Sequence, residues 1–395
     1  MDLEKIRKNE LVGFVFYLLI IVAGYTFIIK FVQLGLPDFI VNYLELKKNA
    51  IILFMFYLAV LTSICCLVFG YSLDKLKWDL ETKLKIFFIC LVLQTPLILL
   101  LFSFNTILLF FLWINLISII MGLQTPISIS FIRDFIRPKY RGLFAGIATA
   151  LIYSYGILSP FPWNISGFIN ELFFGLILGI PTIMIFIGLR LFRNKEKQEI
   201  FNAKGNFVNY NKTLIIMALI GVIFVDSLGF LRIIETPHIY ANVWRGNFDI
   251  KILLVSSHTG FALLSGFLYS KGKPYLILLI SLFMITMVDL FFAFLHNLIF
   301  LSKVLGIFYC GAVSMYTINL LALWGDISTP ESIGKFAGIG IGICGWLMTF
   351  ISTAFSFIFI ESLDFSTHLV ISALISLSFL LFTILIKIQH KAIKE

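Results

Sequence analysis

The chain has 395 residues, of which 60% are hydrophobic and only 13% are charged. Soluble domains carry roughly 25% charged residues, so this composition excludes a soluble enzyme, a disordered chain and a nucleic-acid-binding domain. The formal net charge of +9 must therefore be interpreted by where the basic residues lie. The composition predicts a polytopic membrane protein.

Apolar runs recur along the whole chain, and a helix needs about 20 apolar residues to span a bilayer. Because backbone groups in lipid find no water, each run is expected to be a helix. Twelve runs lie near 11–36, 50–73, 84–103, 106–131, 141–161, 169–192, 213–235, 251–270, 274–296, 299–325, 334–360 and 366–387. The longest hydrophilic stretch predicts a division into an N-terminal six-helix bundle at 1–192, a cytoplasmic linker at 193–212 and a C-terminal six-helix bundle at 213–395.

Basic residues gather at alternate ends of these runs, with large clusters after the second, fourth and sixth. Lys and Arg are enriched on the cytoplasmic side of membrane proteins. With an even number of spans, this bias predicts that both termini are cytoplasmic. The expected location is the plasma membrane.

An internal repeat is the most specific signal. Residues 134–147 and 326–339 share seven identities at a single offset of 192 residues. The shared positions are Asp134, Pro138, Gly142, Phe144, Ala145, Gly146 and Ile147 in the first copy, and Asp326, Pro330, Gly334, Phe336, Ala337, Gly338 and Ile339 in the second. Equivalent halves of this kind are a signature of secondary transporters, whose site lies where the halves meet.

Two short motifs carry a resemblance to a known family. Gly70-x3-Asp74-Lys75 ends the second predicted span, and Arg141-Gly142 opens the fifth. The chain thereby resembles the major facilitator superfamily, although Lys77 stands where the loop 2–3 signature usually has a second glycine. The resemblance covers the whole chain and implies an all-α fold of two pseudo-symmetric six-helix bundles.

The resemblance also implies a cytoplasmic gate, in which Asp74 faces the amino terminus of the eleventh span. The predicted gate residues are Gly70, Asp74, Lys75, Asp134, Arg141 and Asp326. Gly70 would allow close helix packing, and Asp74 would stabilise the positive end of a helix. The alternative is that these residues only cap helices and fix topology.

Charges inside the spans carry the functional hypothesis, because each costs at least about 2.5–3.5 kcal/mol in the bilayer interior. Those predicted within spans are Lys30, Asp226, Arg232, Asp289 and Lys303. Asp289 and Lys303 flank a helix turn at similar depth, roughly 10 Å from it at 1.5 Å per residue, which predicts a structural ion pair.

Lys30 and Arg232 hold matching positions in the first helix of each half. In the superfamily these helices line the central cavity, and the basic pair resembles that of the organophosphate:phosphate antiporter branch. We predict that the two bases bind an organic or phosphorylated anion, which Arg can hold bidentately. The alternative is that both snorkel to the outer interface, with Arg232 paired to Glu235.

Asp226 is the predicted coupling group, because a carboxylate in apolar surroundings can exchange a proton near neutral pH. It could instead be a fixed counter-ion for Lys30 or Arg232. Polar residues predicted to contact substrate by hydrogen bonds are Asn115, Gln124, Tyr316 and Asn319. Helix–helix contact is the alternative for each of them.

The sequence thus predicts a secondary transporter that works by alternating access. The alternatives are a proton-coupled symporter or exporter of a neutral or lipophilic solute, and a transporter-like sensor or scaffold that moves nothing. The sequence has no ATP-binding loop, nucleophile–base pair or metal-ligand spacing, so neither an enzyme nor a cofactor is expected. The expected partners are the bilayer and a small-molecule substrate, which moves with protons or a counter-anion. The protein is expected to be a monomer and to bind no nucleic acid.

Overall fold

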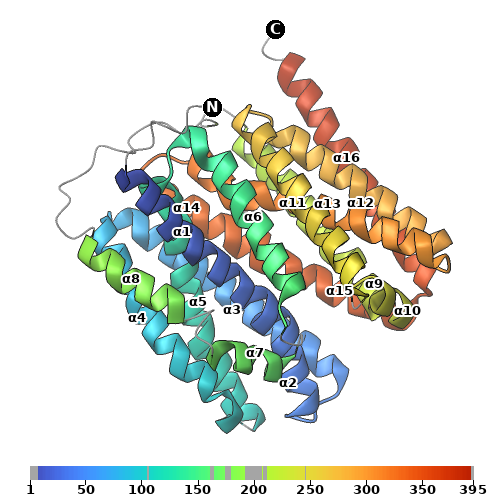
Figure 1. Cartoon of the computed structure of the whole chain (residues 1–395), viewed down its shortest axis with the longest axis horizontal. Coiled ribbons are helices and arrows are strands. Elements are labelled where there is room, and N and C mark those ends of the chain that lie inside the picture. Colours follow the sequence, from blue (N-terminus) through green and yellow to red (C-terminus); the bar gives the residue numbers. More distant parts are fainter. Residues whose placement is uncertain are drawn as a thin grey trace. The chain divides into compact units, whose positions relative to one another are not determined.

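The computed structural model describes residues 8–104, 106–160, 164–173, 179–191, 207, 211–244 and 246–392. Within these ranges every regular element is a helix and no strand occurs (Figure 1). This confirms the predicted all-α class. It follows from the hydropathy of the chain, because only helices satisfy their own backbone groups one segment at a time.

The elements of the first half alternate long helices with short turns. They are α1 (Lys8–Phe27), η2 (Ile28–Gly35), α2 (Leu36–Asn42), α3 (Lys48–Lys75), α4 (Leu80–Leu99), η3 (Leu101–Ser103), α5 (Ile107–Phe135), η4 (Pro138–Tyr140), α6 (Arg141–Leu158), α7 (Ile165–Phe173) and α8 (Gly179–Leu191). The second half follows the same plan. Its elements are α9 (Lys212–Glu235), α10 (Pro237–Asn242), α11 (Phe248–Ser270), α12 (Pro274–Leu295), α13 (Ile299–Ile327), α14 (Ile333–Ala337), η6 (Gly338–Leu347), α15 (Met348–Ser362) and α16 (Phe365–Ala392).

Eleven helical segments among the described residues are long and apolar enough to cross a membrane. The sixth predicted span, 169–192, is represented by α7 and by α8, whose apolar part Pro181–Arg190 is shorter. Residues 174–178 lie outside the described residues. A polytopic chain is therefore confirmed, and the count of twelve spans stays a prediction at that one place.

Side-chain caps fix where several helices begin. Asp79 accepts the backbone N–H of Thr82 at 2.9 Å at the start of α4, and hydrogen bonds from Thr82 hold the pKa of that carboxyl below its ordinary value. Asn211 and Asn247 accept backbone N–H groups at 3.2 Å at the starts of α9 and α11. Such caps satisfy donors that the first helical turn leaves free.

The helices group into two compact units that do not follow the predicted boundary. Unit 1 contains residues 1–144, 159–208 and 324–342, and unit 2 contains 145–158, 209–323 and 343–395. The start of the eleventh span joins unit 1 because α14 packs on α3 and α5. The division into bundles at 1–192 and 213–395 therefore stays a prediction from the repeat.

Glycines allow the closest helix contacts within unit 1. Gly70 on α3 lies against the backbone of Gly334 and Gly338, and Gly122 on α5 lies against Cys65. Backbones approach this closely only where side chains are missing. The predicted close packing at Gly70 is therefore present, and its partner is the start of the eleventh span.

We expect Gly70→Ala to lower the free energy of unfolding by about 1–3 kcal/mol, the usual cost of overpacking. The added methyl group would overlap the carbonyl of Gly334. Gly260→Ala is the matched control, because its methyl group would meet nothing within 4 Å. Thermal unfolding of both variants in detergent measures the difference, and equal melting temperatures would contradict the packing argument.

Candidate functional site

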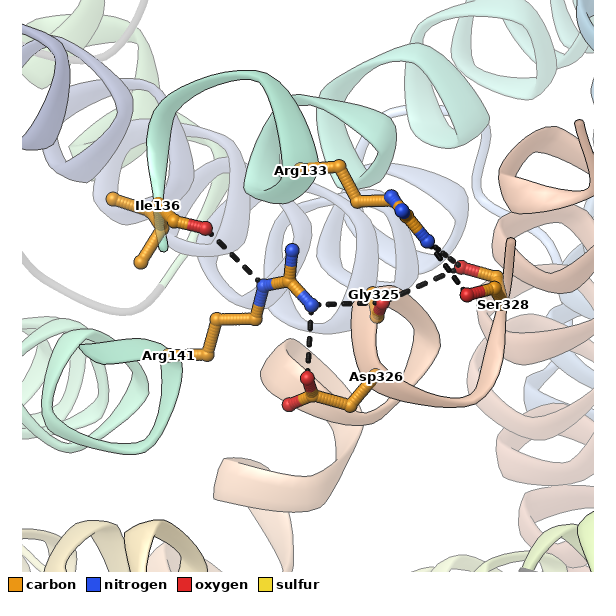
Figure 2. A network of polar contacts seen from close by, with 6 residues as sticks. All are labelled: Arg133, Ile136, Arg141, Gly325, Asp326 and Ser328. Carbon is orange, nitrogen blue, oxygen red and sulfur yellow. Dashed lines mark hydrogen bonds and ion pairs between the residues drawn. The ribbon is translucent and has the colours of Figure 1, made fainter. Parts of the chain in front are cut away.

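A buried ion pair joins the start of α6 to the end of α13 in unit 1. Arg141 Nη1 donates to Asp326 Oδ1 at 2.8 Å and to the carbonyl of Gly325 at 2.8 Å, and Nε donates to the carbonyl of Ile136 at 3.2 Å (Figure 2). Neither Arg141 nor Asp326 is exposed to solvent. Several hydrogen bonds to one guanidinium are what a buried ion pair needs to offset its desolvation.

A second arginine holds the residues that follow α13. Arg133 on α5 is buried, and its Nη1 donates to the carbonyl of Ser328 at 2.6 Å (Figure 2). Carbonyl groups at the end of a helix carry partial negative charge. Both arginines therefore place positive charge at the same end of α13. Without them, the negative charge of Asp326 at this end would be unfavourable.

Asp74, at the end of α3, binds the start of α14. Its Oδ1 accepts the N–H of Gly334 at 2.7 Å, and its Oδ2 accepts the N–H of Lys335 at 2.6 Å. The predicted contact between Asp74 and the amino terminus of the eleventh span is therefore present. Asp74, Arg133, Arg141, Asp326 and Ser328 are together called the junction cluster below.

Two of the predicted gate residues, Asp134 and Lys75, contact other side chains than those of the junction cluster. Asp134 is in the last turn of α5, and its Oδ2 forms an ion pair of 2.7 Å with Lys83 of α4. Lys75 is exposed, with its ammonium group 6.0 Å from the ring centroid of Tyr71. Asp134 and its repeat counterpart Asp326 therefore have different partners, although both end a helix.

Lys30 is paired with an acid that is not among the five charges predicted within spans. Its Nζ lies 2.9 and 2.7 Å from the two carboxylate oxygens of Glu171 and 2.6 Å from Ser159 Oγ. Both Lys30 and Glu171 are buried. Glu171 stands at the beginning of the predicted run 169–192, which is the signal that could have identified it.

The helix around Lys30 also differs from the prediction. Residues 28–35 form a π-helix, which has more residues per turn than an α-helix and often occurs at functional sites. In this segment the side chains near Lys30 therefore do not follow α-helical spacing. Thr26 and Lys30 are buried, whereas Gln33 is exposed.

Asp226 on α9 lies between two tyrosines of α13 in unit 2. The hydroxyl of Tyr316 donates to its Oδ2 at 2.7 Å, and the hydroxyl of Tyr309 donates to its Oδ1. The structure brings together two predicted site residues, Asp226 and Tyr316. Tyr309 is a further member that the sequence prediction lacks, seven residues before Tyr316 on the same helix face.

The predicted ion pair between Asp289 and Lys303 is wrong. Asp289 is fully buried, and its Oδ2 accepts a hydrogen bond of 2.7 Å from Ser372 on α16. Its Oδ1 has no hydrogen-bond partner among the described residues. Similar depth on a helix hairpin does not bring two side chains together, and this carboxyl contacts Ser372 of α16 and faces Gly229 of α9.

Arg232 on α9 is half-buried and pairs with a backbone group. It donates to the carbonyl of Leu363 at 3.4 Å, and its guanidinium lies 5.6 Å from the ring centroid of Phe365. Its Nε has no hydrogen-bond partner within the part of the chain that the structure describes. Arg232 therefore has donor capacity left for a ligand.

The neutral site residues divide into two groups. Asn115 accepts a hydrogen bond of 2.8 Å from Tyr57 of α3, which is a helix–helix contact, and donates to the carbonyl of Phe111 in its own helix. Gln124 Nε2 and Asn319 Oδ1 are buried without a partner in the described ranges. Buried amides that lack partners are better candidates for binding than satisfied ones.

No protein-family model matches the chain, and no curated protein sequence matches it. Solved structures do. The human organic anion transporter MFSD10 has 13% identity and a TM-score of 0.63, over 95% of this chain and 98% of that chain. A bacterial homologue of the iron transporter ferroportin, in an outward-facing state, has 12% identity and a TM-score of 0.65, over 98% of this chain and 100% of that chain.

The proton:xylose symporter XylE of the major facilitator superfamily has 16% identity and a TM-score of 0.61, over 95% of this chain and 94% of that chain. The chain has the major facilitator fold. This confirms the fold expected from Gly70, Asp74 and Arg141. The major facilitator fold is shared by transporters of different solutes, so the solute of this chain must be inferred from its own site residues.

We expect Asp326→Ala to lower the free energy of unfolding by about 3–5 kcal/mol, because it leaves Arg141 as an uncompensated buried charge. Glu81→Ala is the matched control. It breaks an ion pair of 2.6 Å with Lys85, but these side chains are 34% and 60% exposed, so the expected loss is about 0–1 kcal/mol. Thermal unfolding in detergent compares the two variants, and similar losses would contradict the importance of the buried pair.

Proposed function

We propose that this chain is a secondary active transporter that moves a small solute across a membrane by alternating access. The carrying observation is Asp226, a carboxyl in a spanning helix that is bonded to two tyrosine hydroxyls. Ionisable groups inside a membrane segment are costly and mark solute or proton pathways. The major facilitator fold supports the same conclusion.

The proposed solute is an organic or phosphorylated anion. Arg232 supports this class, because its guanidinium has an Nε without a partner among the described residues and could bind a carboxylate or phosphate. Lys30 would contribute only if the anion replaces Glu171 as its partner. One solved structure of the same fold is an organic anion transporter.

The junction cluster is proposed as the cytoplasmic gate. Arg133, Arg141 and Asp74 all hold segment 324–342 within unit 1. A rocker-switch cycle would release this segment when the site opens to the cytoplasm. Gly70 belongs to the same contact. With this assignment both termini are cytoplasmic, and the protein works as a monomer in the plasma membrane.

A proton-coupled transporter of a neutral or lipophilic solute is the second candidate. Asp226 favours it, since a carboxyl that no basic residue pairs with in the described part of the chain can gain and lose a proton. One solved structure of the same fold is a proton:xylose symporter. A sensor or scaffold that moves nothing is the remaining alternative, and an exchange assay excludes it if labelled solute moves.

We expect proteoliposomes loaded with unlabelled phosphate or a dicarboxylate to take up the labelled anion faster than empty liposomes. Arg232→Gln should reduce the uptake at least tenfold, a loss of about 1.4 kcal/mol or more in binding, and Arg232→Lys should keep part of it. Lys271→Gln, which removes the same charge at an exposed position, should leave it unchanged. Equal uptake by the parent and Arg232→Gln would overturn the anion assignment.

We expect an imposed pH gradient to accelerate uptake by the parent protein, whereas Asp226→Asn should respond to no gradient because it cannot exchange a proton. Tyr316→Phe, which removes one donor to Asp226, should keep the response but shift its pH dependence. The measurement is initial uptake with inward, outward and zero gradients. A gradient response that survives in Asp226→Asn would exclude this residue as the coupling group.

A further inference from the structure

Asp289 is a buried carboxyl that the proposed mechanism does not use. It lies where α9, α12 and α16 pack together in unit 2. A methyl group placed on Gly229 of α9 would come within 2.7 Å of Asp289 Oδ1 and 2.8 Å of Oδ2, so the whole carboxyl faces the backbone of α9. Ser372 is its one hydrogen-bond donor among the described residues.

A row of polar side chains on α16 runs past this carboxyl. His368, Ser372 and Ser376 are four residues apart, so they share one helix face, and all three are fully buried. Ser376 lies 2.7 Å from Thr286 Oγ1 on α12, three residues before Asp289. A buried polar seam therefore runs between α12 and α16 beside Asp289.

His368 stands at the outer end of the seam, one turn after α16 begins at Phe365. Its Nε2 lies 3.1 Å from the carbonyl of Leu228, so Nε2 carries the proton and Nδ1 is the free acceptor of the neutral ring. Nδ1 has no hydrogen-bond partner within the described ranges. His368 therefore has no hydrogen bond to Ser372 or to Asp289 in the described part of the chain.

The charged and titratable groups around Asp289 come from three helices. Asp226 on α9 is near enough for its charge to act on Asp289, and the charge of Asp289 acts on Tyr309 of α13. Arg232 of α9 acts on His368. No Lys or Arg forms an ion pair with Asp289 in the described part of the chain. An ionised carboxylate buried this way is very costly, so a proton is the counter-charge that the site can hold.

We propose that Asp289 is a second proton-binding site in addition to Asp226. A proton taken up from water binds Oδ1 of the carboxylate, which has no partner among the described residues, and gives a neutral carboxylic acid while Ser372 still donates to Oδ2. The inference rests on proton coupling in the proposed function and adds the second site.

Infrared difference spectroscopy of the full-length protein in detergent tests the site directly, with pH jumps and no solute present. Two interacting carboxyls titrate in two steps that belong to the pair. Among the carboxylic-acid steps of the parent, Asp226→Asn should remove one and Asp289→Asn should remove another. If Asp289→Asn leaves the parent titration unchanged, or if Lys303→Gln alters it, the proton site at Asp289 is overturned.

Ser372→Ala tests the same site without changing Asp289. It removes the one donor to this carboxyl among the described residues, so it should shift the pH of the Asp289 step, whereas Ser376→Ala should not. An unchanged titration in Ser372→Ala would overturn the proton site, even if Asp289→Asn does not fold. Because no solute is used, failed anion exchange would reject the transport proposal and leave this result standing.

Discussion

The structure depends on one constraint, which is that a charge inside a bilayer must find a partner other than water. In unit 1 two buried pairs join opposite charges, Lys30 with Glu171 and Arg141 with Asp326, and buried Arg133 meets a backbone carbonyl. In unit 2 the carboxyls of Asp226 and Asp289 meet hydroxyl groups. A carboxylate beside an arginine keeps its charge, whereas one beside hydroxyls can be neutralised by a proton. Ion pairs suit the proposed gate, which must hold helices together, and carboxyls bonded to hydroxyl groups suit the proposed proton sites.

The internal repeat explains the backbone better than it explains the side chains. Asp134 and Asp326 end equivalent helices, yet one pairs with Lys83 and the other with Arg141. Arg141 has Ile333 at the repeat offset, so the second copy has no equivalent arginine. A repeat preserves the turn and its glycines because the backbone path requires them. The charged residues of the junction cluster can differ between the copies, so the repeat does not duplicate the cluster.

The helices could be predicted because hydropathy alone decides what enters a bilayer, and with them the charges of Lys30 and Asp289, which the structure buries. Side-chain contacts could be predicted only where a known motif specifies them, as for Asp74. Asp289 and Lys303 show the limit, since sequence position gives depth along a helix but not the direction in which a packed helix turns a side chain. Glu171 shows another, because a short helix can bury an acid at the edge of an apolar run. The π-helix at Lys30 is a third, because apolar composition predicts a helix but not the number of residues in each of its turns.

The same physics limits how the proposed gate can open. Removing one partner of a buried ion pair costs about 3–5 kcal/mol, and moving a two-state equilibrium from 1:99 to 99:1 takes about 5.5 kcal/mol. Separating Arg141 and Asp326 while both stay buried would thus cost a free energy close to the whole amount that switches such an equilibrium. Both residues lie at helix ends next to the short loops 136–140 and 328–332. Opening at this end would admit water to both charges as they separate, so hydration replaces the ion pair. An ion pair at a helix end can therefore be stable when the gate is closed and still separate within a transport cycle. A pair at mid-membrane depth could not, because water would not reach its charges.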